Sequence, residues 1–415
     1  MVLLLAASLV VAACGGSMQG RAGPGEIDVR KLDVGKYAVL PYEFREAVYH
    51  HTVSQGRALA IARLANSVAL GTEIDPALRY GIERHAIDEP REVAAVLADA
   101  TRSVAEKHGV MFGFSVRSRT TPLRENTYAS EVLEGEPDQG DTTAVGITVL
   151  QLPDQARARA AALELEQADF WLAPDLNVPV FLDNYPAAQG HWRPGVRSMV
   201  SVVAHGQYVV HVYAVAPKPE LGALRSLTER TLAAQLPLLD ALPPLSPREV
   251  LRLDRDPDGV LRRVLDPRER MPSQPAFDVD YTTATMTPRA FLQLTEDRQE
   301  WKRILDLGGV DRIATVYEGA LLLRARDRDA AERVWQARKD LPTTTPLAGP
   351  QVPDTFCFNN AEKYSPAGPY VSRETRYLCV LRYDRYVAVV MSNQVPDLYQ
   401  RAAAQYALLA NSAYL

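Results

Sequence analysis

Cys14 is the residue whose neighbours carry the most specific chemistry. It ends the sequence Val11-Ala12-Ala13-Cys14, which closes an apolar run that begins at Met1. Small residues before a cysteine suit the narrow cleft of a signal peptidase, and only a thiol can take up a diacylglycerol group as a thioether. The run is too short to span a bilayer. We therefore predict that residues 1–13 are a lipoprotein signal peptide and that Cys14 is lipidated.

The alternatives at this end of the chain are an ordinary signal peptide and a buried N-terminal strand. No Lys or Arg precedes the apolar run, where a signal peptide is expected to be positive, so we expect the true translation start to lie upstream. Several acyl chains, palmitate among them, would hold Cys14 in the membrane permanently, since one chain binds only marginally. We expect an extracytoplasmic protein anchored to the cell membrane, with residues 14–28 as a flexible tether.

Cys357 and Cys379 are the two remaining cysteines of the three in the chain. In an exported protein an even pair favours a disulfide bond. Closing a loop of about 20 residues would stabilise the fold by about 3 kcal/mol, mainly because it restricts the unfolded chain. A redox or metal-binding pair is the alternative, but neither cysteine belongs to a CxxC motif and no His lies nearby in sequence.

Residues 254–259 (DRDPDG) begin like a calcium-binding loop, with acidic residues at the first, third and fifth positions and glycine at the sixth. Leu265 stands at the twelfth position, where such a loop needs a bidentate Glu, and Pro257 stiffens the turn. We predict a solvated turn here and no bound metal.

Four histidines and one serine are the other candidates for chemistry: His50, His51, His205, His211 and Ser115. The adjacent side chains of His50 and His51 would diverge on a helix or a strand, and His205 and His211 flank a predicted hairpin turn. We expect each histidine to lie on the surface or to have its hydrogen bonds satisfied. Ser115 lies in a strand-like segment (GFSVR) that lacks the second glycine of a nucleophile elbow.

Catalytic and cofactor motifs are not found, so we predict no catalytic residue, no metal and no cofactor. The sequence has no GxxxxGK[ST], no GxGxxG and no HExxH. The formal net charge is -5, and no basic stripe with interleaved aromatic residues is present, which argues against nucleic acid as a partner. An enzyme is therefore less favoured. The alternative function kept open is a hydrolase of envelope esters or glycosides that uses His50, His51 or Ser115.

The chain contains an internal duplication that is weak in identity but consistent in pattern. Each copy has a strand, a helix, a short strand, a hairpin rich in Val and Tyr, and a closing helix. The first copy uses residues 143–151, 152–170, 178–182, 199–215 and 224–242, and the second uses 314–324, 327–340, 355–358, 377–391 and 396–411. An amphipathic helix precedes each copy, at 90–107 and 288–307. This alignment places Phe181 opposite Cys357 and Ser201 opposite Cys379.

Aromatic residues are enriched in the irregular segment that follows the first helix of each copy. The first copy has Trp171, Tyr185 and Trp192, and the second has Phe358, Tyr364 and Tyr370. Such loops could line a groove for a glycan or a lipid. Loops that fold over the edge of a core are the simpler alternative.

The length of 415 residues and the hydrophobic fraction of 47% predict two domains, each with its own core. Hairpins combined with helices predict an α+β fold, in which each domain is a mostly antiparallel sheet with helices packed on one face. Eight prolines between residues 237 and 275 mark the boundary. We place the N-terminal domain at 29–243, a Pro-rich linker at 244–275 and the C-terminal domain at 276–415.

The order of three short segments resembles a family of actinobacterial envelope lipoproteins of the mycobacterial and nocardial type. The segments are 29–37 (VRKLDVGKY), 112–117 (FGFSVR) and 308–314 (GGVDRIA). This family carries a domain of unknown function in two parts, and the similarity covers essentially the whole mature chain. The resemblance implies a surface lipoprotein with no established activity, and it carries over no catalytic residue.

We therefore expect a lipid-anchored envelope protein that acts by binding an envelope glycan, lipid or protein partner and not by catalysis. A purely structural surface coat is a further alternative.

Overall fold

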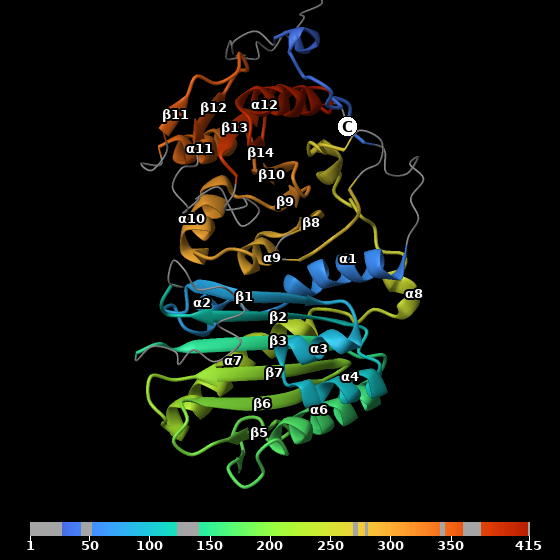
Figure 1. Cartoon of the computed structure of the whole chain (residues 1–415), viewed down its shortest axis with the longest axis vertical. Coiled ribbons are helices and arrows are strands. Elements are labelled where there is room, and N and C mark those ends of the chain that lie inside the picture. Colours follow the sequence, from blue (N-terminus) through green and yellow to red (C-terminus); the bar gives the residue numbers. More distant parts are fainter. Residues whose placement is uncertain are drawn as a thin grey trace, which may run out of the picture.

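The computed structural model describes residues 27–42, 52–122, 141–268, 273–278, 281–340, 345–359 and 375–413. Within these ranges each half of the chain forms one antiparallel sheet with helices against it, and α1 and α9 lie between the two sheets (Figure 1). The predicted α+β fold with an antiparallel sheet in each domain is confirmed.

The N-terminal sheet has, among the described residues, seven strands in the order β1-β2-β3-β7-β6-β5-β4. Their bounds are β1 Tyr80–Ile87, β2 Phe112–Arg119, β3 Ala144–Gln151, β4 Val178–Val180, β5 Gln189–Trp192, β6 Ser198–His205 and β7 Tyr208–Val215. The C-terminal sheet, counted the same way, has the order β8-β9-β10-β14-β13-β12-β11. Its strands are β8 Ala284–Met286, β9 Arg312–Thr315, β10 Ala320–Arg324, β11 Thr345–Leu347, β12 Thr355–Asn359, β13 Tyr377–Tyr383 and β14 Tyr386–Ser392.

Helices follow the same order in both halves. Those of the N-terminal half are α1 Val53–Ala65, α2 Gly71–Ile74, α3 Val93–Val96, α4 Arg102–His108, α6 Gln155–Phe170, α7 Leu221–Asp240 and α8 Pro247–Val250. Those of the C-terminal half are α9 Pro288–Gln293, α10 Arg298–Gly308, α11 Arg328–Lys339 and α12 Val395–Ala410. Short 3-10 turns, η1 to η4, lie at Val29–Lys31, Pro90–Glu92, Asp99–Thr101 and Leu261–Arg263.

Strand order confirms the internal duplication, because β1, β2, β3, β7, β6, β5 and β4 correspond one by one to β8, β9, β10, β14, β13, β12 and β11. The register corrects one predicted equivalence. Cys379 pairs with Cys357, whereas Ser201 pairs with Gly190, so Gly190 and not Phe181 stands where Cys357 stands. The strand predicted over 314–324 is also wrong: it is the β9–β10 hairpin, because Glu318 has a positive φ of 58° in the turn between them.

Helices cover both faces of each sheet, and not one face as predicted. In the N-terminal domain α4 and α6 pack on one face, and α1, α2 and α7 pack on the other. In the C-terminal domain α12 covers one face, while α9, α10 and α11 lie on the other. The central strands require this, since β3 and β7 are buried at almost every position and a strand buried on both faces needs two apolar layers.

Two predicted helices are interrupted. Residues 90–107 form two short helices with 3-10 turns, and 288–307 is divided into α9 and α10. Asp297 caps the start of α10, and the preceding Glu296 carbonyl accepts a hydrogen bond from Gly81 N at 2.8 Å. This loop thus lies along the outer edge of β1 and joins the two domains.

The joint between the domains is apolar but contains one fully buried cation. Arg298 donates to the Leu292 carbonyl at 3.1 Å and to Ser118 Oγ of the other domain. Burial lowers the pKa of Arg298 to about 9. Because a buried polar group is costly when it is displaced from its partners, these contacts favour one docking geometry.

Residues 29–39, predicted at the start of the N-terminal domain, pack on the C-terminal sheet. Tyr37 is buried beside α12, and its hydroxyl hydrogen-bonds the Asp397 carboxylate. Asn411 donates to the Val39 carbonyl at 2.8 Å. The segment that leads from Cys14 therefore enters the fold at the C-terminal domain. In the described part of the chain, no helix combines the length and the apolar character needed to cross a membrane.

Candidate functional site

A band of polar side chains crosses the face of the N-terminal sheet that α6 covers. The strand register places its members in two adjacent rows, because directly paired residues share a face. One row contains His85, Ser115, Thr148 and His211, and the next contains Glu83, Arg117, Tyr213 and His191. We call these eight residues the polar band. An apolar row, Ile87, Leu150 and Val209, lies beside them and packs against α4 and α6.

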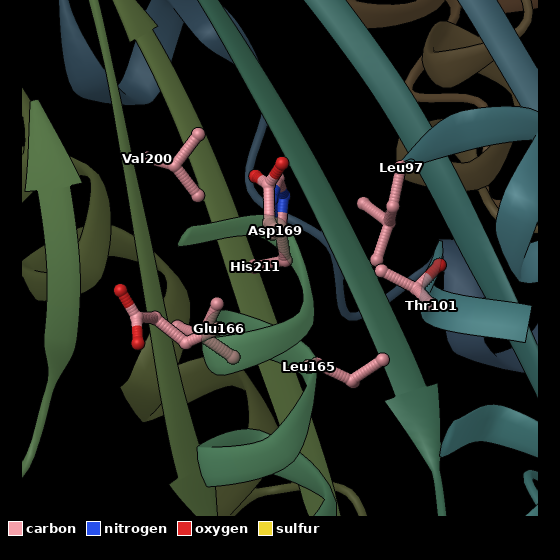
Figure 2. Close-up of a pocket in the computed structure, with 8 residues that line it drawn as sticks. Leu97, Thr101, Leu165, Glu166, Asp169, Val200 and His211 are labelled. Carbon is pink, nitrogen blue, oxygen red and sulfur yellow. The ribbon is translucent and has the colours of Figure 1, made fainter. Parts of the chain in front are cut away.

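A small cavity opens at one end of the polar band, with about 10 Å³ of space for the centre of a water molecule (Figure 2). Glu166 and Asp169 line it from α6, Val200, Val202 and His211 from the sheet, and Leu97, Thr101 and Leu165 complete the wall. A buried water needs roughly 10–15 Å³ by this measure. The cavity therefore has room for about one water molecule.

His191 links the two carboxylates of this cavity. Its Nδ1 lies 3.1 Å from Glu166 Oε1, and its Nε2 lies 3.8 Å from Asp169 Oδ2. The contact with Glu166 is a hydrogen bond, whereas the contact with Asp169 is too long for one. The pKa of the Asp169 carboxyl lies above its usual value, because burial raises it more than the neighbouring His191 lowers it. Among the described residues no group donates a hydrogen bond to the Asp169 carboxylate, whose side chain is 28% exposed.

His211 is buried, with 8% of its surface exposed, and its ring borders the cavity. No hydrogen bond from this ring to another described residue is found. Burial, together with the nearby His191 and Arg117, lowers the pKa of His211 to about 4. The ring is thus a neutral imidazole near pH 7, with one nitrogen that donates and one that accepts.

Other members of the polar band satisfy one another. Arg117 forms an ion pair with Glu83 at 3.0 Å, and its guanidinium lies over the Tyr213 ring. Ser115 Oγ lies 2.8 Å from Thr148 Oγ1, so it is bonded to a hydroxyl and not to a histidine. Ser115 is therefore not hydrogen-bonded to a basic side chain that could activate it.

The C-terminal domain has apolar side chains at several of the equivalent positions, although Thr315 stands where Ser115 stands. Register places Val389 opposite His211, Leu321 opposite Thr148, Phe358 opposite His191 and Ala284 opposite His85. All four are buried beneath α9 to α11. The same architecture therefore closes this face without a histidine or a charged side chain at these four positions, so the fold does not require the histidines of the polar band.

The chemistry available at the cavity is hydrogen bonding without metal. In the part of the chain that the structure covers, no group of three or more His, Cys, Asp or Glu side chains is arranged to hold a metal ion. The cavity presents an imidazole donor, an imidazole acceptor and the acceptor oxygens of Asp169. A water molecule complements this set, because it both donates and accepts hydrogen bonds.

The predictions made for individual residues differ in how they agree with the structure. His205 is satisfied as predicted, since its Nε2 lies 2.6 Å from Asp240 Oδ1 at the surface. His211 is neither at the surface nor hydrogen-bonded to a described residue, so the prediction for it is wrong. Cys357 and Cys379 form the predicted disulfide, with Cα atoms 4.0 Å apart. Cys14, His50 and His51 lie outside the described residues, as do Tyr364 and Tyr370.

The calcium-like segment is not a solvated turn. Asp256 is buried, and its carboxylate accepts hydrogen bonds from Leu261 N at 2.8 Å and Arg262 N at 3.0 Å. Asp258 forms an ion pair with Arg312. The carboxylates thus shape a turn that packs against the C-terminal sheet.

Aromatic residues after α6 divide into two groups. Trp192 and Tyr185 are half-buried and fold over the core, as the simpler prediction held. Trp171 and Phe181 are 68% and 74% exposed. Six of the eleven exposed large apolar side chains in the described ranges fall in this region, namely Trp171, Leu172, Leu176, Val178, Phe181 and Val196. We call these six the Trp171 surface. Phe170 connects it to the polar band, because its ring contacts both Trp171 and His191.

Sequence reasoning did not find His191, Glu166 and Asp169. A signal existed for the first of these: the register of the two copies places a histidine where the other copy has Phe358. Glu166 and Asp169 carry no comparable signal, because acidic residues are common on helices and their inward direction depends on the packing of α6.

Family comparison covers both halves of the chain. Residues 48–255 match the model described as "Domain of unknown function (DUF7373) N-terminal", and residues 260–412 match the corresponding C-terminal model. Neither the curated proteins nor the solved structures contain a significant match.

Proposed function

Given that the chain belongs to the DUF7373 family, whose description names no activity, we propose that it is a lipid-anchored envelope protein that acts by binding. The anchor is the thioether lipid on Cys14, and the setting is outside the cytoplasmic membrane of an actinobacterium. The ligand is a component of the envelope.

Two observations support the anchored setting. Cys14 follows an apolar run and two alanines, and the Cys357–Cys379 disulfide suits an oxidising compartment. The segment that follows the anchor enters the fold beside α12, at the end of the molecule opposite β5 (Figure 1). On this proposal the C-terminal domain lies near the membrane, and the N-terminal domain points away from it.

The Trp171 surface is the observation that carries the binding function. Its six exposed apolar side chains fall within residues 171–196, and this concentration suits a contact surface, because exposed apolar residues are otherwise usually scattered singly. Trp171 and Phe181 belong to the far end of the N-terminal domain, near the end of α6 and beside β4. A surface at this place faces away from the anchoring membrane and is open to another component of the envelope.

The experiment is native mass spectrometry of the full lipidated chain, released gently from the membrane of its own host. We expect a discrete non-covalent adduct that disappears on denaturation, and an acyl mass on Cys14 that Cys14→Ser removes. The double variant Trp171→Ser/Phe181→Ser tests the surface. The matched control is Leu163→Ser/Tyr281→Ser, which also removes two exposed apolar side chains but lies outside the Trp171 surface.

The proposal holds if the adduct survives in the control and is lost in the Trp171 variant. A bare protein mass in the wild type, or equal loss in both variants, would overturn the binding function. An unmodified Cys14 would overturn the anchor alone.

A further inference from the structure

The tip of the N-terminal domain that carries the Trp171 surface is held in one shape by its own hydrogen bonds. After α6 ends at Phe170, the Asn177 side chain donates to the Phe170 carbonyl at 2.9 Å, and Asn177 N donates to the Ala173 carbonyl at 3.0 Å. In the neighbouring turn Trp192 Nε1 donates to the Val196 carbonyl at 2.8 Å. The exposed apolar side chains are therefore presented by an ordered backbone, which lowers the entropy lost when a partner binds.

Polar side chains of residues 171–196 are largely paired within the chain. Asp183 forms an ion pair with Arg225 at 2.8 Å. Asn184 Nδ2 donates to Glu229 Oε2 at 2.8 Å, and the Asn177 amide is bonded to the backbone. Recognition of a glycan needs hydrogen-bonding groups that are free to meet its hydroxyls, whereas contact with hydrocarbon needs none. The surface is therefore suited to an apolar partner.

The charge of the same segment is balanced. The Asp, Glu, Lys and Arg side chains of residues 171–196 are Asp175, Asp183 and Arg193, and Asp183 is paired with Arg225. One carboxylate and one guanidinium remain, so the segment has no net attraction for a cationic or an anionic partner. This balance matches an uncharged lipid surface better than a partner that is recognised by its charge.

The strand β4 lies in this segment and is the outer strand of its sheet. It is three residues long, and Pro179 in its middle has no N–H to donate. Short length and proline both hinder pairing at the edge of a sheet. Pro346 has the same place in β11, the outer strand of the C-terminal sheet. The edge is therefore poorly suited to a protein segment that adds to the sheet as a further strand.

The two copies differ in the side chains that this edge presents. Register places Thr345 where Val178 stands, and Ala348 follows β11 as Phe181 follows β4. The C-terminal copy thus lacks the large apolar side chains of these two positions, and it is the copy at which the segment from Cys14 enters the fold. β5, which pairs with β4, and α12 lie at opposite ends of the molecule (Figure 1).

We propose that the Trp171 surface inserts into an uncharged lipid surface other than the membrane that holds Cys14, so that the protein links two lipid layers. Trp171 and Phe181 take the boundary between head groups and hydrocarbon, which aromatic side chains favour, and the leucine and valine side chains enter the hydrocarbon. This inference rests on the proposed binding function and names a lipid as the class of ligand. The adduct in the native mass spectrum should therefore have the mass of a lipid.

The test is the capture of vesicles by the full chain. The chain is reconstituted in phosphatidylcholine donor vesicles, which take up its N-terminal apolar end, and protein-free phosphatidylcholine vesicles with a second dye are added. We expect the donor vesicles to capture the second vesicles. Trp171→Ser/Phe181→Ser should reduce capture by about tenfold or more, since two large apolar side chains leave the contact. The control Leu163→Ser/Tyr281→Ser should leave capture unchanged. Salt and added phosphatidylglycerol should have little effect, because the surface carries no net charge.

A direct measure of insertion is fluorescence quenching by brominated phosphatidylcholine placed only in the second vesicles. It should quench the tryptophan fluorescence of the wild type. Trp171→Phe keeps an aromatic ring at the surface, so this variant should still capture vesicles but lose most of the quenching.

Four results would overturn the lipid surface. They are no capture, equal loss of capture in the control variant, capture that requires phosphatidylglycerol or disappears in high salt, and capture only between vesicles that both carry the protein. The last result would assign the surface to a second copy of the chain. If the second vesicles are not captured but the native adduct still depends on the Trp171 surface, the lipid surface fails and the binding function stands. If the adduct is absent as well, both fail.

Discussion

The sheet face beneath α6 and the sheet face beneath α11 occupy the same place in the two domains. The first carries His85, Thr148, His191 and His211, and the second carries Ala284, Leu321, Phe358 and Val389 in the same register. Both faces are covered by helices, and the apolar one is the more favourable to bury. The histidines of the first face are therefore not required by the fold.

The second difference between the copies concerns a covalent bond. Cys357 and Cys379 pair across β12 and β13, while Gly190 and Ser201 pair across β5 and β6. A side chain at Gly190 would meet the Val200 carbonyl oxygen at 2.4 Å from its Cβ, so a cysteine does not fit there. The sheet of the C-terminal domain is thus cross-linked at a position where the sheet of the N-terminal domain is not.

The largest effect is expected when histidine is placed at position 389, which corresponds to His211 in the C-terminal copy. Val389→His should reduce the free energy of unfolding by about 4 kcal/mol, roughly half from overpacking and half from an imidazole buried without a partner. Denaturant unfolding of the full chain measures the change, and Val389→Ile at the same position separates the overpacking. A loss below about 1 kcal/mol would mean that the C-terminal face accommodates an imidazole. The difference between the two copies would then not reflect what each face can bury.

Removing the disulfide should have the next largest effect. Cys357→Ala with Cys379→Ala should cost about 3 kcal/mol, because the separation of 22 residues closes a loop in the unfolded chain. The midpoint of urea unfolding under oxidising conditions measures it. As a control, Gly190→Cys with Ser201→Cys should give no gain in stability, and a gain comparable to 3 kcal/mol would show that the copies are interchangeable at this position.

Acid should act on the N-terminal copy through His211. Its pKa is about 4 in the folded chain and 6.5 when unfolded, so the unfolded chain binds the proton more strongly. This contribution to stability is complete above pH 6.5 and is lost as the pH falls toward 4. Between about pH 7.5 and about pH 4.5 the wild type should lose about 2.5 kcal/mol relative to His211→Val. Parallel pH profiles of unfolding would show instead that His211 is not shielded.

The smallest effect is expected for His211→Val at neutral pH. Valine is the residue of the other copy, and it removes an unsatisfied imidazole, so the stability should change by less than about 1 kcal/mol in either direction. Thermal and urea unfolding measure it. A loss of about 3 kcal/mol would show that the fold depends on His211.

Particular elements show how far the sequence was informative. The alternation of Val and Tyr predicted β6, β7, β13 and β14, because a strand places every second residue on one face. Strands β1 and β8 were not predicted, because neither shows a strong alternation of apolar and polar residues. The division of 288–307 into α9 and α10 depends on the loop that binds β1 of the other domain, which no local pattern contains.

The candidate site divides in the same way. Ser115 and His211 were noticed as chemical types, but their neighbours were not, since the band forms from five separate strands. Whether a histidine is satisfied depends on which groups surround it in three dimensions. His205 has Asp240 beside it and His211 has none of the described groups as a hydrogen-bonding partner, although the two lie six residues apart on one hairpin.

By itself the sequence determined the class of fold, the duplication and the pairing of Cys357 with Cys379, because composition, periodicity and cysteine number are local or additive properties. The tertiary structure decided that helices cover both faces, that residues 29–39 belong with α12, and that Glu166 and Asp169 point toward His191 and His211. These features depend on strand register and on the packing of distant segments. A shift of one residue in register would turn the whole polar band to the other face, so only the assembled sheet places these groups around one cavity.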